Sequence, residues 1–214
     1  MNFCQTQNPN RMKRLIIEFI GTMFLVLVIG ISGNPLVIGS VLMGMIYMGG
    51  HLSGAHYNPA ITTAILLRGK MTLNEAGGYW IAQILGGLLG AAVAYWFKDG
   101  ATPIAVATGL DGEKMLLQAI VGEILFTFAL TMVVLNVATS NHTIGNSYYG
   151  IAIGFTVFAG GMCVGPISGG SFNPAVGISH NLFAQNWSDI WVHIVCPLVG
   201  SAVAASVYKM TDAD

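Results

Sequence analysis

The sequence predicts an all-α membrane protein with six transmembrane helices and two re-entrant half-helices, arranged as an inverted three-helix repeat. Two compositional facts favour a membrane protein: 54% of the 214 residues are hydrophobic, and only 8% are charged, whereas a usual globular domain has about 25% charged residues. Long apolar blocks and a motif that occurs twice, SGAHYNPAIT at 53–62 and SGGSFNPAVG at 168–177, indicate the repeat.

Six apolar blocks are expected to cross the membrane once each: 15–31, 35–50, 76–97, 115–138, 148–167 and 188–208. A helix needs roughly 20 residues, or somewhat fewer, to cross the hydrocarbon core. The first block runs directly into the second with no cleavage site after it, so it does not read as a signal peptide. We therefore expect a multi-pass protein of the cell membrane, surrounded by membrane lipid.

Positive charges are distributed unevenly about these six spans. Six of the eight lysines and arginines fall on one side: Arg11, Lys13, Arg14, Arg68, Lys70 and Lys209. Only Lys98 and Lys114 fall on the other side. The positive-inside rule therefore predicts that both termini are cytoplasmic. The net charge of −1 gives no reason to expect nucleic acid. The three scattered cysteines give no disulfide framework or metal spacing, and we expect no cofactor.

The two halves match beyond the quoted motif. Glu18 stands in EFIGTMF at the start of the first block, and Glu123 stands in GEILFTF at the start of the fourth. Each half contains three spans, an odd number, so the second copy must enter the membrane from the opposite face. We expect the repeats, about 13–97 and 115–208, to form one domain over 1–214.

Two stretches at the Asn-Pro-Ala motifs, 61–67 and 175–183, are apolar but too short to cross a bilayer. Irregular backbone at membrane depth needs protein or a water-filled cavity around it. Asn is a good N-cap and Pro suits the first helical position, so each motif is expected to open a half-helix. A single copy would be an ordinary surface turn. Two copies in equivalent places favour half-helices whose positive dipole ends meet at a pore.

On these residues the sequence resembles the aquaporin (major intrinsic protein) superfamily. The resemblance runs from about Lys13 to Tyr208, and GHLSGAHYNPAIT at 50–62 follows the family's first signature loop almost residue for residue. It implies one pore per protomer, four protomers in a homotetramer, and water and small uncharged solutes as the molecules that pass.

The resemblance also implies roles for single residues. The pore motifs are Asn58, Pro59, Ala60, Asn173, Pro174 and Ala175. Glu18 and Glu123 match buried glutamates that brace the two loops, His56 matches a loop-supporting position, and His51 is expected near the cytoplasmic vestibule. Small residues are expected to allow close helix packing: Gly86, Gly87, Gly90, Ala91 and Gly200.

The residue after the second Asn-Pro-Ala departs from the family pattern. Most members carry an arginine there, which narrows the selectivity filter and adds a positive charge, but this chain has Val176. Alignment outward from the motifs places the other filter positions at Ile38, Gly161 and Gly170. We therefore expect a wide, apolar, uncharged filter, similar to that of members that pass bulkier neutral solutes. The predicted function is a passive channel for water and for glycerol-like polyols, urea or metalloid hydroxides, including methylated arsenicals.

Other functions fit less well. A strict water channel usually has aromatic and histidine filter residues beside the arginine. A coupled secondary transporter can also use inverted repeats, but its candidate ion-binding groups, Glu18 and Glu123, are assigned to bracing. The paired motif argues against a purely structural membrane protein. No catalytic constellation is visible, and the spacing of His51 and His56 is a weak metal pattern, so we do not expect an enzyme.

Overall fold

The computed structural model describes residues 10–106 and 112–211, and within these ranges it contains eight α-helices and one short 3₁₀ helix. They are α1 (Arg11–Ser32), α2 (Pro35–Ser53), α3 (Pro59–Leu67), α4 (Leu73–Lys98), α5 (Gly112–Thr139), η1 (Asn141–Thr143), α6 (Tyr149–Ser168), α7 (Pro174–Ala184) and α8 (Ile190–Thr211). Six of them are long and apolar enough to span a membrane: α1, α2, α4, α5, α6 and α8. The predicted fold class is confirmed.

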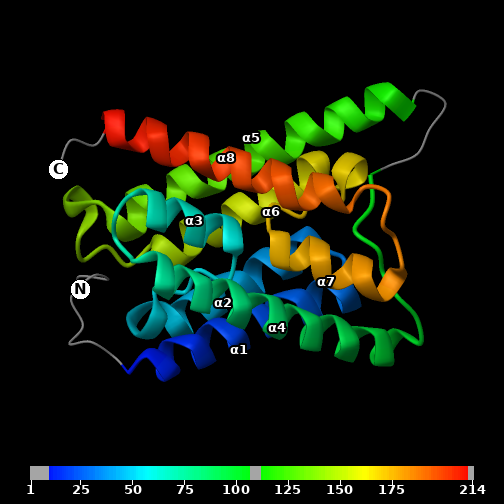
Figure 1. The fold of residues 1–214 in the computed structure, drawn as a ribbon, viewed down its shortest axis with the longest axis horizontal. Helices are drawn as coiled ribbons and strands as arrows, with labels where there is room; N and C mark the ends of the chain where they lie inside the picture. The colour runs from blue at the N-terminus through cyan, green and yellow to red at the C-terminus, as the bar shows by residue number, and fades with distance from the viewer. Residues whose placement is uncertain (1–9, 107–111, 212–214) are drawn as a thin grey trace.

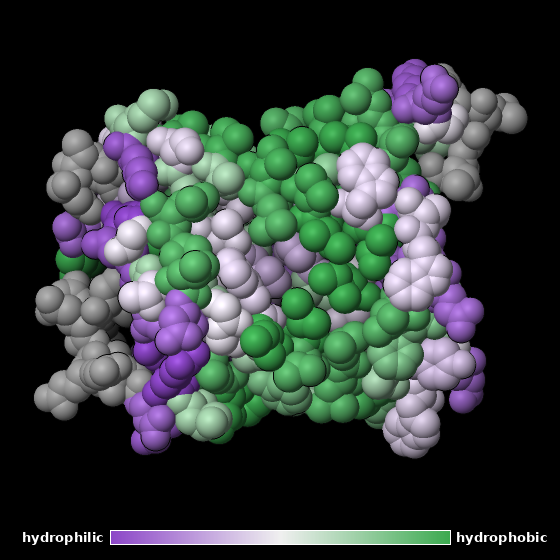
Figure 2. Space-filling view, viewed as in Figure 1, coloured by the Kyte–Doolittle hydropathy of each residue, from purple (hydrophilic) through white to green (hydrophobic). Residues whose placement is uncertain are grey.

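The six spanning helices lie side by side, with both ends of the described chain on the same side of the bundle (Figure 1). We call the side with Asn10 and Thr211 the terminal face, and the other side, where α4 ends at Lys98, the distal face. Figure 2 shows an apolar band between the two faces, with hydrophilic residues along both margins. Exposed aromatic residues near the distal face, Trp96, Phe97, Trp187 and Trp191, suit a membrane interface.

The short helices α3 and α7 are the two predicted half-helices. The Asn58 Oδ1 atom accepts a hydrogen bond from the Ala60 N–H at 2.8 Å, and the Asn173 Oδ1 atom accepts one from the Ala175 N–H at 3.0 Å. Both predicted N-caps are therefore confirmed. Helix α3 lies in the half of the bundle toward the terminal face and α7 in the distal half (Figure 1). The half-helices thus approach the centre from opposite sides.

The loops that precede the half-helices have the same backbone shape. Positive φ angles recur at three pairs of equivalent positions: Gly54 (90°) and Gly169 (86°), Ala55 (51°) and Gly170 (64°), and Tyr57 (49°) and Phe172 (47°). Residues other than glycine enter this region at a cost of roughly 1–2 kcal/mol each. Interactions elsewhere in the structure must therefore hold Ala55, Tyr57 and Phe172 in place.

Small residues allow the long helices to approach one another closely. A Cβ atom added at Gly86 or Gly90 of α4 would collide with backbone carbonyl oxygens of α1, those of Phe19 and Met23. A Cβ atom at Gly200 of α8 would collide with the Ile124 oxygen of α5. Gly87 faces the Ser179 side chain of α7, and Ala91 is buried. These residues pack the bundle tightly and hold the loops between rigid helices.

Gly86→Leu is expected to abolish folding, because its side chain would have to displace the backbone of α1. Gly77→Leu, on the same helix, is the matched control, since a Cβ atom at Gly77 would have nothing within 4 Å. Size-exclusion chromatography of detergent-purified protein measures the result. Equal yields of monodisperse protein for the two variants would show that the α1–α4 contact is not needed for folding.

Candidate functional site

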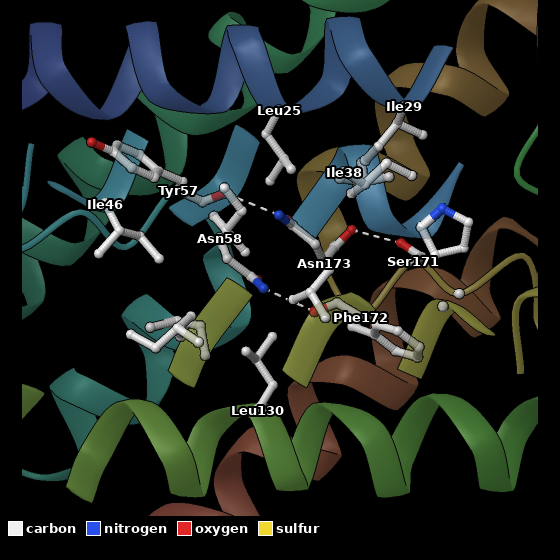
Figure 3. Close-up of a pocket in the computed structure, with 18 of the residues that line it drawn as sticks. Leu25, Ile29, Ile38, Ile46, Tyr57, Asn58, Leu130, Ser171, Phe172 and Asn173 are labelled. Atoms are coloured by element: carbon white, nitrogen blue, oxygen red, sulfur yellow. Dashed lines mark hydrogen bonds between the residues drawn. The ribbon is translucent and has the colours of Figure 1, made fainter. Parts of the chain in front are cut away.

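A cavity of about 370 Å³ lies between the two half-helices. Its lining runs from Ala138 and Tyr149, near the terminal face, to Gly33 and Pro35, near the distal face. Most of the wall is aliphatic, and Figure 3 shows Leu25, Ile38, Ile46 and Leu130 around its centre. No lysine, arginine, aspartate or glutamate occurs among the described residues that line it. A molecule inside would meet an apolar, uncharged wall with few polar groups.

The two motif asparagines meet at the centre of this cavity (Figure 3). The Asn58 Nδ2 atom donates to the Phe172 carbonyl oxygen at 2.8 Å, and the Asn173 Nδ2 atom donates to the Tyr57 carbonyl oxygen at 2.9 Å. Each asparagine therefore caps its own half-helix and bonds to the loop of the other. These reciprocal bonds join the two halves of the chain.

The asparagines also supply donors to the cavity. A side-chain amide has two N–H groups, and each Asn uses one of them in the bond to the opposite loop. The second N–H has no acceptor among the residues that the structure describes, and both side chains line the cavity. A molecule that crosses this level can accept a hydrogen bond from each asparagine. The convergent helix N-termini add positive potential at the same place.

Glu18 is fully buried and accepts four hydrogen bonds. Its Oε1 atom accepts from the Ser53 hydroxyl at 2.7 Å and the His56 N–H at 3.0 Å. Its Oε2 atom accepts from the Tyr57 N–H at 2.7 Å and the Gln83 Nε2 atom at 2.8 Å. The carboxylate thereby holds the backbone of the first loop, including Tyr57 with its positive φ.

Glu123 holds the second loop in a similar way but with fewer donors. Its Oε1 atom accepts from the Ser168 hydroxyl at 2.8 Å and the Ser171 N–H at 2.9 Å, and its Oε2 atom accepts from the Phe172 N–H at 2.8 Å. No counterpart of Gln83 donates to it within the described ranges. The buried His193 Nδ1 atom lies 3.8 Å from Oε1, which is too far for a hydrogen bond.

The two glutamates should contribute strongly to stability. Glu123→Ala leaves three donors without their acceptor. The Ser168 hydroxyl keeps a second acceptor, the Val164 carbonyl oxygen at 3.2 Å, but the Ser171 and Phe172 N–H groups are left unsatisfied, and each buried unsatisfied group costs about 1–3 kcal/mol. We expect a clear fall in the thermal unfolding temperature of purified protein, and a larger fall for Glu18→Ala, which leaves four. Glu113→Ala is the control, because Glu113 lies exposed on the same helix as Glu123. If Glu123→Ala unfolded at the same temperature as Glu113→Ala, the bracing role would be refuted.

The four predicted filter residues, Ile38, Gly161, Gly170 and Val176, all line the cavity. A Cβ atom added at Gly170 would lie 3.4 Å from the Gly161 Cα atom, so these two glycines are neighbours. The space beside Gly161 is not open, although this residue has no side chain. A Cβ atom there would lie 3.0 Å from the Pro35 Cβ atom. A side chain at position 161 would therefore pack tightly against the Pro35 ring, which lines the same cavity.

The two predicted histidines have different positions. His56 lines the cavity, and its Nδ1 atom lies 3.1 Å from the Thr62 hydroxyl of α3. His51 is exposed in the last turn of α2 and is not among the described residues that line the cavity.

Sequence reasoning missed Gln83, Pro35 and the carbonyl groups of Tyr57 and Phe172. A signal existed only for Pro35, because Asn34-Pro35 repeats the dipeptide that opens both half-helices.

Comparisons with known proteins agree with this geometry. The sequence model of the family described as "Major intrinsic protein" matches residues 29–208. Aquaporin NIP1-1 of Zea mays is 33% identical over 92% of this chain and 74% of its own length. Nodulin-26 of Glycine max is 32% identical over 93% of this chain and 78% of its own. Aquaporin NIP3-1 of Arabidopsis thaliana is 34% identical over 92% of this chain and 67% of its own.

The same fold occurs among solved structures. The aquaglyceroporin from Plasmodium falciparum superposes with a TM-score of 0.76, covering 94% of this chain and 96% of its own, at 21% sequence identity. At that identity the superposition supports the fold alone. The family match and the relatives carry the assignment: this chain belongs to the major intrinsic protein family, the aquaporins.

Proposed function

We propose that this protein is a passive channel through which water and small uncharged solutes cross a membrane. Aquaporin-family proteins are channels for water and small solutes rather than enzymes. The single observation that carries the proposal is the cavity of about 370 Å³, which runs between the half-helices without a charged side chain among its described lining residues. Two asparagine amides at its centre supply hydrogen bonds to a polar molecule that has lost part of its hydration.

We propose that the channel passes glycerol-like polyols, urea and metalloid hydroxides in addition to water. The filter positions Ile38, Gly161, Gly170 and Val176 carry no guanidinium, imidazole or aromatic ring. A neutral solute larger than water therefore meets neither a fixed charge nor an aromatic ring from these four residues. A strict water channel is the alternative, and the solutes that pass distinguish the two.

Ions should not pass this channel. An ion would lose its hydration shell in an apolar passage, which is costly because the wall offers few replacement ligands. Cations would also meet the positive N-termini of α3 and α7. The absence of the filter arginine leaves both barriers in place. We expect neutral substrates only, such as glycerol or undissociated arsenite.

We propose the remaining assignments on the same basis. The two repeats, 13–97 and 115–208, form one channel domain, with Asn58 and Asn173 at the pore centre and Glu18, Glu123 and His56 supporting the loops. The positive charges at the terminal face support cytoplasmic termini, by the positive-inside rule. The membrane is the cell membrane, and the assembly is a homotetramer, as is typical of the family.

Stopped-flow light scattering on proteoliposomes tests the proposal, with water, glycerol, urea and arsenite measured in parallel. We expect rapid water efflux, followed by reswelling as each neutral solute enters at a rate proportional to its gradient. Water flux without solute entry would identify a strict water channel. Solute entry that saturates or follows a pH gradient would instead identify a coupled transporter, and no flux above that of empty liposomes would refute both.

A further inference from the structure

Pro35 lies on the wall of the cavity beside the predicted filter. It lines the cavity together with Ile38, which stands three residues later on the same face of α2. The ring is close to Gly161 of α6: a Cβ atom added to that glycine would lie 3.0 Å from Pro35 Cβ and 3.3 Å from Pro35 Cγ. The ring therefore lies directly against the place where a side chain at position 161 would begin.

The structure fixes the position of this ring in two ways. Pro35 is the first residue of α2, and the Asn34 Oδ1 atom accepts a hydrogen bond from the Leu36 N–H at 2.9 Å, which caps the helix. One turn further on, α2 crosses α6 with Gly39 directly against Gly154, where a Cβ atom on either residue would collide with the carbonyl oxygen of the other. This close crossing brings the start of α2 against Gly161.

We propose that Pro35 sets the upper size limit for solutes at the distal constriction, as a fifth filter residue beside Ile38, Gly161, Gly170 and Val176. The inference rests on the proposed function. Gly161 and Gly170 together would leave a gap in the wall, and the Pro35 ring closes the part of it that faces α2. The ring is rigid and apolar, so it limits width without offering a hydrogen bond. The neutral solutes that pass are therefore selected by cross-section more than by polarity.

The obvious other role of Pro35 is structural, because proline at the first helical position favours a helix start. Two substitutions separate the roles. Pro35→Ala removes the ring, whereas Pro35→Val keeps most of its apolar bulk, and both lose the proline backbone. Asn34 still caps the helix in each case, and neither substitution removes an N–H that the fold uses, since proline has none.

The test measures permeability to water, glycerol and the larger polyol erythritol in one proteoliposome preparation of each variant. For Pro35→Ala we expect a severalfold rise in the ratio of erythritol to water permeability, with little change in water permeability. Pro35→Val should keep the wild-type ratio. A rise of similar size in both variants would mean that the helix start, and not the ring, sets the limit. An unchanged ratio in Pro35→Ala would also overturn the inference.

A double-mutant cycle with Gly161→Ala tests the contact between Pro35 and Gly161 directly. Alone, Gly161→Ala should reduce glycerol permeability, because its methyl group competes with the ring for the same space. In the Pro35→Ala background the same change should have little effect. Additive effects would contradict the proposal. Wild-type protein that passes water but no glycerol would instead refute the proposed function, so the two failures can be told apart.

Discussion

Asn173→Asp is expected to abolish selective conduction while the protein still assembles. In the native protein the Asn173 Nδ2 atom donates to the Tyr57 carbonyl oxygen at 2.9 Å. An aspartate would place a carboxylate oxygen against that carbonyl oxygen, so electrostatic repulsion would replace the hydrogen bond. The Asn173 Oδ1 atom that caps α7 can be replaced by the other carboxylate oxygen. The fold of α7 should therefore survive better than the joint between the two loops.

The same substitution changes the field in the cavity. Asn173 is only 3% exposed, so a carboxylate at this position would lie buried beside two convergent helix N-termini. Its negative charge would neutralise the positive potential that excludes cations. It also removes the amide donor that a passing molecule would use. We expect glycerol permeability to fall to that of empty liposomes, or cation leakage to appear. Asn58→Asp should have the same effect. Unchanged solute permeability together with full cation exclusion would contradict the assignment.

Asn146→Asp is the matched control for these variants. Asn146 also donates from its Nδ2 atom to backbone carbonyl oxygens, those of Val137 at 2.7 Å and Thr143 at 2.8 Å. It does not line the cavity among the residues that the structure describes. The control therefore loses the same kind of bond at another place. Solute permeability and cation exclusion should both be retained.

Val176→Arg is expected to lower the ratio of solute to water permeability. Val176 is buried within the protein but lines the cavity, so a longer side chain at this position can extend into it. The guanidinium can donate to backbone carbonyl oxygens of the second loop, which limits the cost of burying its charge. A reduction of about tenfold would correspond to a barrier about 1.4 kcal/mol higher for the solute than for water.

Val176→Met separates obstruction from charge. Methionine is long, flexible and neutral, so it narrows the passage without adding donors. If volume alone matters, glycerol permeability should fall to a similar extent in both variants. If the hydrogen bonds that the guanidinium donates hold it across the passage, Val176→Arg should lower the ratio of solute to water permeability more than Val176→Met does. Both variants must first give monodisperse protein, because a misfolded channel would lose all fluxes together.

The sequence was sufficient to predict the membrane spans and the half-helices, because both depend on local properties. Block length and apolarity define a span, and Asn-Pro defines a capped helix start at Asn58 and Asn173. The loop-bracing prediction for Glu18 and Glu123 relied on the resemblance to the aquaporin family. The structure adds their partners, the N–H groups of Tyr57 and Phe172.

Contacts between distant segments could not be predicted in this way. Nothing near Gln83 in the sequence indicates that its amide donates to Glu18, 65 residues away. The carbonyl oxygens that accept from the two asparagines depend on positive φ angles at Tyr57 and Phe172, where local preference would disfavour them. The width at Gly161 depends on where α2 crosses α6, which brings Pro35 against it. The residue identities at the aligned filter positions could not show this contact.

An uncharged constriction should admit neutral solutes larger than water. The most direct test measures glycerol and water permeability in the same proteoliposome preparations, for wild type and for Val176→Arg. We expect that wild-type protein conducts both, that protons and metal cations are excluded, and that Val176→Arg lowers the ratio of glycerol to water permeability. A wild type that conducts water alone, or an unchanged ratio in the variant, would contradict it.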